Sequence, residues 1–162
     1  MALRTIRVIG DEILTKKARE IKEVTPHIRE LADDMLETMY AANGAGLAGP
    51  QVGVLKRIVV IDVGEGPYIM INPELLETEG EQVGSEGCLS VPGKFGIVAR
   101  PEKGKARYFD LDMKEHVIEA EGLFARCICH ERDHLDGILY TEKTKDGLYD
   151  VDEEEEGKGL EE

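Results

Sequence analysis

One short motif in this chain has the residue types and spacing of a metal-dependent hydrolase. It runs from His130 to His134 with the sequence HERDH, which fits the pattern H-E-x-x-H. Residues four apart on a helix lie on one face, so the two imidazoles can reach a single metal ion. Glu131 follows the first histidine and can reach a metal-bound water as a general base. A histidine pair with this spacing can also simply pack against a core, so the motif alone does not prove a metal site.

A catalytic site of this type usually has a third protein ligand, and the three cysteines of the sequence are the candidates. Cys127 lies seven residues before the second histidine, a helix rise of about 10.5 Å, whereas ligands lie only about 2.0–2.3 Å from a zinc ion. Cys129 points roughly 100° away from the first histidine. Both are therefore expected to be small buried apolar side chains. That leaves Cys88, next to Gly87, where the absence of a side chain permits close approach of the backbone.

A third segment, from Gly44 to Gly53, combines four glycines with a single polar side chain, Gln51. It lacks the lysine of a phosphate loop and the strand-to-helix setting of a dinucleotide-binding turn. Small residues permit close backbone approach, and Gln51 could donate a hydrogen bond to an oxyanion. By itself the segment is more typical of a tight turn with a surface glutamine.

Hydrophobic periodicity indicates the elements that position these motifs. Thr25 and Pro26 are a typical helix start, and apolar side chains then recur at helical spacing through residue 40. A second helix is expected over residues 121–136, ended by Gly137, and a shorter one over 11–19. Strands are expected at 57–63, 67–72, 75–83, 96–100, 105–111 and 116–120. A run of strands between two helices, without regular alternation of strands and helices, predicts an α+β fold.

Length and charge limit the classes of protein to which this chain can belong. Its 162 residues suffice for one domain, and 34 acidic against 20 basic residues give a formal net charge of −14. The segment from Asp150 to Glu162 has eight acids and one lysine, so half of that charge lies there. We expect one catalytic domain over residues 1–148 and an acidic, flexible tail over 149–162. The acid excess disfavours broad phosphate neutralisation, so direct nucleic-acid binding is not expected.

Other features predict a cytoplasmic protein without a membrane partner. No apolar run approaches the roughly 20 residues of a transmembrane helix, and residues 1–10 lack the apolar region of a signal peptide. Three sparse cysteines do not make a disulfide framework, which favours a reducing compartment.

Taken together and in this order, three segments resemble the peptide deformylase family: GAGLAGPQ at 44–51, EGCLS at 86–90 and HERDH at 130–134. The likeness extends from the N-terminus to about Leu148 and includes IMINPELL and SVPGKFG. Gly49 replaces the family's second alanine, and Cys129 stands where glutamine is frequent, but neither change removes a presumed ligand. Some bacterial members end in a basic helix thought to dock on the ribosome. The acidic tail has the opposite charge, so docking through it is not inferred.

The resemblance implies antiparallel β-sheets packed around a central metal-binding helix, with an N-terminal helix. It implies a bacterial enzyme that removes the N-formyl group from the N-terminal methionine of nascent chains and releases formate. The resemblance leaves open whether the protein makes a transient contact with the ribosome. One divalent metal, Fe²⁺ in the cell or Zn²⁺, Ni²⁺ or Co²⁺, would be held by Cys88, His130 and His134.

The resemblance also implies roles for other residues. Glu131 would take a proton from the attacking water, and the Gln51 amide and the Leu89 backbone N–H would donate to the oxyanion. The resemblance further implies residues that bind the peptide, either through backbone hydrogen bonds or by surrounding the methionine side chain. These are Ala45, Gly46, Gly87, Phe95 and Cys127. Asp133 is expected to pair with Arg100 and anchor the helix; the alternative is a solvated surface acid.

Two other functions are compatible with parts of this pattern. The first is a zinc endopeptidase, because many such enzymes carry H-E-x-x-H. Many of them take a third ligand downstream, as histidine or glutamate. Here the chain has no histidine after residue 134, and its later glutamates are confined to a short segment and the tail. The second is a non-catalytic homologue that holds a metal and binds nascent chains, although the presence of Glu131, Gln51 and Cys88 disfavours it.

Overall fold

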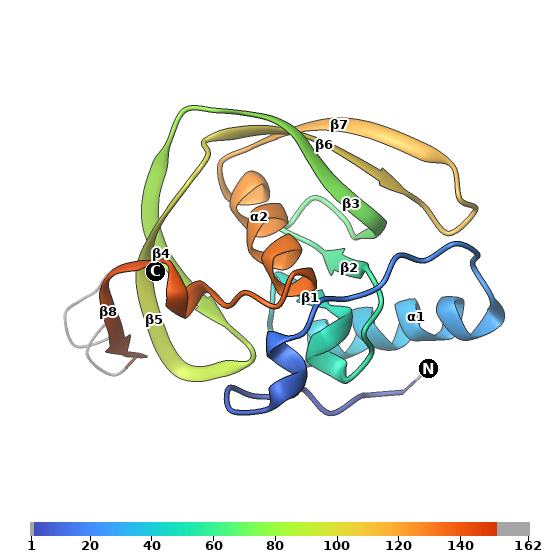
Figure 1. Cartoon of the computed structure of the whole chain (residues 1–162), viewed down its shortest axis with the longest axis horizontal. Coiled ribbons are helices and arrows are strands. Elements are labelled where there is room, and N and C mark those ends of the chain that lie inside the picture. Colours follow the sequence, from blue (N-terminus) through green and yellow to red (C-terminus); the bar gives the residue numbers. More distant parts are fainter. Residues whose placement is uncertain (1, 152–162) are drawn as a thin grey trace.

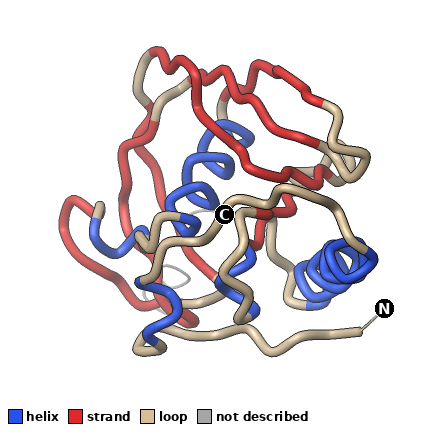
Figure 2. Tube along the Cα trace, turned by 45° about the vertical axis from the view of Figure 1, so that its right-hand side comes forward, coloured by secondary structure: helices blue, strands red, loops and turns tan. Residues whose placement is uncertain are grey.

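A computed structural model describes residues 2–151 of the chain. The helices are α1 (Pro26–Ala41) and α2 (Leu123–Leu135), with 3-10 turns η1 (Glu12–Thr15), η2 (Gly49–Val52) and η3 (Tyr140–Glu142). The strands are β1 (Gly46–Ala48), β2 (Ile58–Ile61), β3 (Tyr68–Glu79), β4 (Gln82–Cys88), β5 (Val91–Arg100), β6 (Lys103–Phe109), β7 (Glu115–Glu121) and β8 (Thr144–Asp150). Figures 1 and 2 show α2 in the middle of the molecule, with strands around it and α1 on one side.

The strands form two antiparallel sheets, with the orders β1-β2-β3-β6-β7 and β4-β5-β8. The chain passes from the first sheet to the second through residues 80–81 and returns through residues 101–102, as Figure 1 shows. The predicted α+β fold, with antiparallel sheets around a central helix, is therefore confirmed. No helix within residues 2–151 has the length and apolar character needed to cross a membrane.

Strand β2 explains why one sheet packs against both helices. Its four residues, IVVI, are all buried. Ile58 and Val60 pack in the cluster that contains the apolar face of α1. Val59 and Ile61 pack in the cluster that contains the apolar residues of α2. Successive side chains of a strand point to opposite faces, so a continuous β-branched run fits a strand covered on both sides.

The ends of both long helices follow from local residues. The Thr25 hydroxyl accepts a hydrogen bond from the Ile28 N–H at 3.3 Å and caps α1, with Pro26 at the first helical position. After α2 the chain turns at Gly137, where φ is +78°. A Cβ there would lie 2.6 Å from the Thr15 carbonyl oxygen, so the turn requires glycine.

Strand β3 is longer than the sequence pattern predicts. We expected a strand to end at Asn72, before Pro73, but β3 continues to Glu79. Asn72 has a positive φ of 53°, and the pairing with β6 shifts register between Ile71 and Glu74. Such a bulge accommodates a proline, which has no N–H to donate to the ladder. The Asn72 side chain is fixed there by hydrogen bonds to the backbone of Ile21.

Three other expectations need correction. The predicted helix over 11–19 is only the single turn η1. The predicted strand over 75–83 is divided between β3 and β4, because the chain turns at Gly80 with φ +72°. Strand β8 was not predicted, and it continues to Asp150, two residues beyond the expected domain boundary after residue 148. The rest of the expected tail, from residue 152 on, lies outside the described residues.

Candidate active site

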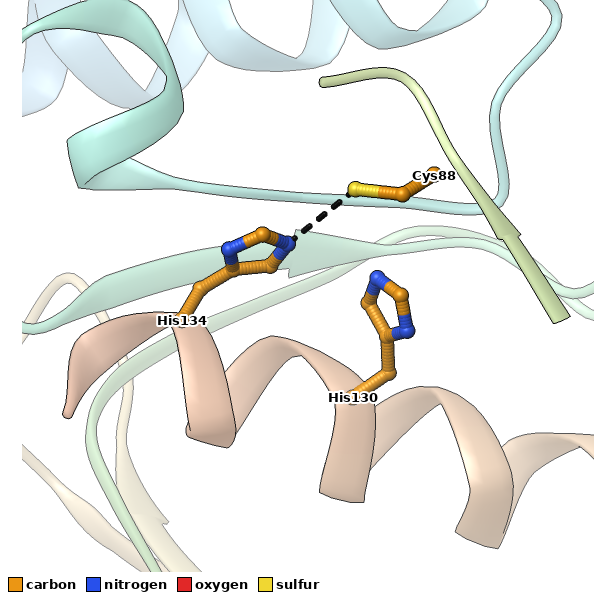
Figure 3. Close-up of side chains that lie close together, drawn as sticks. All are labelled: Cys88, His130 and His134. Atoms are coloured by element: carbon orange, nitrogen blue, oxygen red, sulfur yellow. Dashed lines mark hydrogen bonds between the residues drawn. The ribbon is translucent and has the colours of Figure 1, made fainter. Parts of the chain in front are cut away.

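Helix α2 and the end of β4 bring together the three predicted metal ligands. His130 and His134 project from one face of α2 toward Cys88, which ends β4 (Figure 3). Their ligand atoms all lie within 4.8 Å of one another. The Sγ of Cys88 lies 3.3 Å from Nε2 of His134, and the two imidazole centroids are 5.0 Å apart. Helical spacing therefore does place both histidines on one side, and a residue distant in sequence completes the group.

This arrangement fits a divalent metal. Bond lengths of about 2.0–2.3 Å around a tetrahedral ion place neighbouring ligand atoms roughly 3.5 Å apart, close to the separation between Cys88 and His134. A thiolate with two imidazoles suits zinc, iron and other first-row transition metals. The two histidines are buried while Cys88 is partly exposed, so the group opens to solvent on the cysteine side.

Glu131 lies beside this group and is almost fully buried, with 4% of its surface exposed. Its Oε1 has no hydrogen-bond partner among the described residues. Burial raises the pKa of Glu131 to about 7, although the charge of His130 acts in the opposite direction. A carboxyl group with such a pKa can both accept and return a proton near neutral pH.

Gln51 is buried in η2, and its amide orientation is fixed by three contacts. Its Oε1 accepts from the Ala48 N–H at 2.9 Å. Its Nε2 donates to the Ser90 hydroxyl at 3.0 Å and lies 3.6 Å from the Sγ of Cys88. The NH₂ end therefore faces the segment from Cys88 to Ser90, which includes the backbone of Leu89.

A cavity of about 430 Å³ connects these groups. Of the residues predicted to act on or bind the peptide, those that line it are Ala45, Gly46, Gln51, Gly87, Cys88, Leu89, Cys127, His130 and Glu131. Cys127 also packs against the main core, and burial raises the pKa of its thiol to about 12. Cys129 is buried, and burial raises its pKa too. Cys129 is therefore the small buried side chain that was expected, whereas Cys127 is only partly buried, because it lines the cavity.

Phe95 is not brought to this cavity. It is absent from the described residues that line it, and its ring instead stacks on Tyr149 of β8, with centroids 5.3 Å apart. The prediction that Phe95 contacts the methionine side chain is therefore not supported by its position. The sequence did not reveal β8, so the partner of this ring could not be foreseen.

The expected contact between Asp133 and Arg100 is present, and it belongs to a larger buried cluster. Arg100 Nη1 donates to Asp133 at 2.8 Å, while its Nε and Nη2 donate to Glu86 at 2.7 and 2.9 Å. Arg126 donates to the same carboxylate at 2.7 Å, and the Nδ1 of His130 lies 2.8 Å from it. Burial disfavours ionisation of Glu86, but hydrogen bonds from Arg100 and His130 outweigh it and hold its pKa well below the usual range.

Sequence reasoning missed Glu86 and Arg126, although Glu86 stands in the segment that carries Cys88. The contacts of Glu86 reach residues 14, 40 and 44 positions away. No local pattern reveals such contacts. The available signal was an acidic residue two positions before a candidate metal ligand.

Comparison with known proteins agrees with the three sequence segments. Residues 3–148 match the family model described as Polypeptide deformylase. A peptide deformylase of Agathobacter rectalis is 68% identical over 151 residues, covering 93% of this chain and 96% of the relative. Peptide deformylase 1 of Clostridium acetobutylicum is 57% identical over 143 residues, covering 88% and 95%.

Solved structures give the same result. The crystal structure of peptide deformylase from Thermotoga maritima has a TM-score of 0.87 at 40% identity, covering 88% of this chain and 98% of that one. The Ehrlichia chaffeensis enzyme in complex with actinonin also has a TM-score of 0.87 at 40% identity, with coverages of 90% and 91%. Neither the endopeptidase nor the non-catalytic alternative gains support from these matches. The chain belongs to the polypeptide deformylase family, enzymes that remove the N-formyl group from nascent chains.

Proposed function

We propose that this chain hydrolyses the formamide bond of N-formylmethionyl polypeptides, releasing formate and a free N-terminal amine. The observation that carries the proposal is the meeting of three groups at one cavity. These are the Cys/His/His group, of which Cys88 and His130 line the cavity, the Oε1 of Glu131, which has no hydrogen-bond partner among residues 2–151, and the amide of Gln51. A nucleophile, a proton acceptor and an oxyanion donor are what hydrolysis of an amide requires.

Cys88, His130 and His134 are the residues that we propose to hold the metal. A divalent ion bound there would supply Lewis acidity and a water molecule of lowered pKa. Fe²⁺ is the ion that we propose in the cell, on the family resemblance, and Zn²⁺, Ni²⁺ and Co²⁺ suit the same donor types.

Glu131 acts as the proton carrier in this proposal. Its Oε1, which has no hydrogen-bond partner within residues 2–151, accepts a proton from the water that attacks the formyl carbon. The raised pKa, about 7, then allows Glu131 to deliver that proton to the nitrogen of the leaving amine. Burial of the carboxyl group keeps bulk water away from this exchange.

Gln51 and the Leu89 backbone N–H stabilise the negative charge that develops on the formyl oxygen. The fixed contacts of Gln51 with Ala48 and Ser90 support this role, because they orient its NH₂ group before the substrate binds. Donors that are already oriented cost little reorganisation at the moment of reaction.

Strand β1 is the proposed binding edge for the peptide. It is an edge strand of its sheet, and Gly46 in it lines the cavity. An extended peptide can pair with such an edge through main-chain hydrogen bonds, which do not depend on the peptide's sequence. Ala45, Gly87 and Cys127 line the same cavity and are the proposed neighbours of the methionine end.

The test is an anaerobic incubation of the iron-loaded protein with a formylated peptide and with its unformylated counterpart. We expect formate release and a peptide that has lost only its formyl group, measured by enzymatic formate assay and mass spectrometry. Cleavage at an internal peptide bond would instead indicate an endopeptidase. Absence of formate from fully metal-loaded protein would support the non-catalytic homologue.

We also infer that the reaction takes place in the bacterial cytoplasm, on chains leaving the ribosome, with at most a transient ribosome contact. The net charge of −14 supports a ribosome contact that is at most transient, because it disfavours direct binding to RNA phosphates. Co-sedimentation with ribosomes that carry a nascent chain, but not with purified ribosomal RNA, is the expected result. Binding to the naked RNA at physiological salt would contradict it.

A further inference from the structure

The carboxylate of Glu86 lies at the centre of the buried charge cluster, with 5% of its surface exposed. Its Oε2 accepts hydrogen bonds from Nε of Arg100 and Nη1 of Arg126, each at 2.7 Å. Its Oε1 accepts from Nη2 of Arg100 at 2.9 Å and lies 2.8 Å from Nδ1 of His130. Two guanidinium groups thus compensate a single buried negative charge, which makes an anionic carboxylate stable in this position.

We propose that Glu86 is a positioning residue that fixes the imidazole of His130 for metal binding. A carboxylate can only accept hydrogen bonds, so Nδ1 of His130 must carry the proton and donate it. The lone pair of the same ring then lies on Nε2, the atom left to bind a metal. This inference rests on the metal-ligand set proposed above and adds the residue that orients one member of it.

The other histidine of the group lacks such support from the part of the chain that the structure describes. Nδ1 of His134 is buried and has no hydrogen-bond partner among residues 2–151. The orientation of His134 therefore depends on packing, whereas that of His130 is set by a charged acceptor. A loss of the Glu86 carboxylate should consequently act on the metal site through His130.

Glu86 also joins the two elements that supply the ligands. It lies in β4, two residues before Cys88, while Arg126 and His130 are one turn apart on α2. Arg100 extends the cluster from β5 to Asp133 on α2. One carboxylate thus ties the cysteine-bearing strand to the histidine-bearing helix, so its replacement should weaken metal binding more than peptide binding.

The test measures metal affinity rather than turnover. Zn²⁺ affinity of the metal-free protein is determined by competition with a chromophoric chelator for the parent, Glu86→Gln and the exposed-strand control Glu77→Gln. We expect Glu86→Gln to lose affinity by about 10–100-fold, the usual effect of removing the hydrogen-bond partner of a ligating histidine. Glu77→Gln should match the parent. Parent-like affinity in folded Glu86→Gln would overturn the proposal.

A second measurement uses only the parent and is independent of how variants fold. Long-range ¹H–¹⁵N spectra of the zinc-loaded protein report which imidazole nitrogen carries the proton. We expect His130 to be protonated at Nδ1 and metal-bound through Nε2. Metal binding through Nδ1, or an unprotonated Nδ1, would overturn the proposal without affecting the proposed deformylation itself.

Discussion

The side chain of Glu131 and the backbone of Gly46 occupy adjoining space, and this contact controls where the proton carrier sits. A Cβ at position 46 would lie 2.5 Å from Oε2 of Glu131 and 3.0 Å from its Cδ. Glycine at this position therefore permits β1 to serve as a binding edge while the carboxylate stays directly beside it.

Gly46→Ala should displace the Glu131 carboxylate without removing a metal ligand. A misplacement of about 1 Å in a catalytic group can cost on the order of 10²-fold in rate, so we expect a loss of that size in kcat/KM. Zn²⁺ affinity should stay at the parent value. Gly104→Ala is the matched control, because the nearest atom to its Cβ lies at 3.5 Å, an ordinary contact. Equal activity of the two variants would refute the role assigned to the Gly46 contact.

Gln51→Leu removes the proposed side-chain donor to the oxyanion. We expect kcat to fall about 10²–10³-fold, with a smaller change in KM, because the donor acts mainly in the transition state. The variant also leaves the Ala48 N–H without its acceptor, which costs about 1–3 kcal/mol of stability. Steady-state kinetics on protein shown to be folded separates the two effects. A variant that loses stability but keeps its kcat would restrict Gln51 to a structural role.

At the scale of elements, α2 is fastened to the second sheet near its C-terminal end. Asp133 accepts from Arg100 at 2.8 Å and also lies 3.0 Å from Nζ of Lys143, the residue that precedes β8. Arg100 belongs to β5, so this one carboxylate connects the helix with the small sheet and with the residue that leads into its last strand.

Asp133→Asn should loosen this connection while leaving the bonds between Arg100 and Glu86 in place. We expect the free energy of unfolding to fall by about 1.5–3 kcal/mol, the usual worth of a hydrogen bond to a charged group. Chemical denaturation of the metal-free protein measures it. A variant with parent stability and parent metal affinity would show that Asp133 does not anchor the helix.

Elements whose signals are local could be predicted from the sequence, and those that depend on distant partners could not. The cap at Thr25, the β-branched run of β2 and the spacing of His130 and His134 are contained in short windows. The polar strand β8 exists because it pairs with β5, and Glu86 matters because of residues up to 44 positions away. Neither contact leaves a pattern in the surrounding sequence, so the ligands were predicted while their support was missed.

At the scale of the whole molecule, the two sheets close around α2, and β8 is the last described element to contribute to them. We propose that residues 152–162 contribute nothing to catalysis, as expected of an acidic tail on a single catalytic domain. A chain that ends at Val151 should keep the parent melting temperature and kcat/KM. A chain that ends at Gly147 also loses Tyr149 and Asp150, which pair with β5, and should melt at a lower temperature. Reduced kcat/KM in the Val151 truncation would show that the tail acts in catalysis.

The central claim is that Glu131 carries the proton in a hydrolysis performed at the Cys88, His130 and His134 group. It is tested most directly by comparing formate release from the parent and from Glu131→Gln, both loaded anaerobically with iron to the same measured content. The amide has nearly the shape of the carboxyl group but cannot accept the proton, so kcat should fall about 10²–10⁴-fold while iron content is unchanged. Formate release at the parent rate from fully loaded Glu131→Gln would contradict the account.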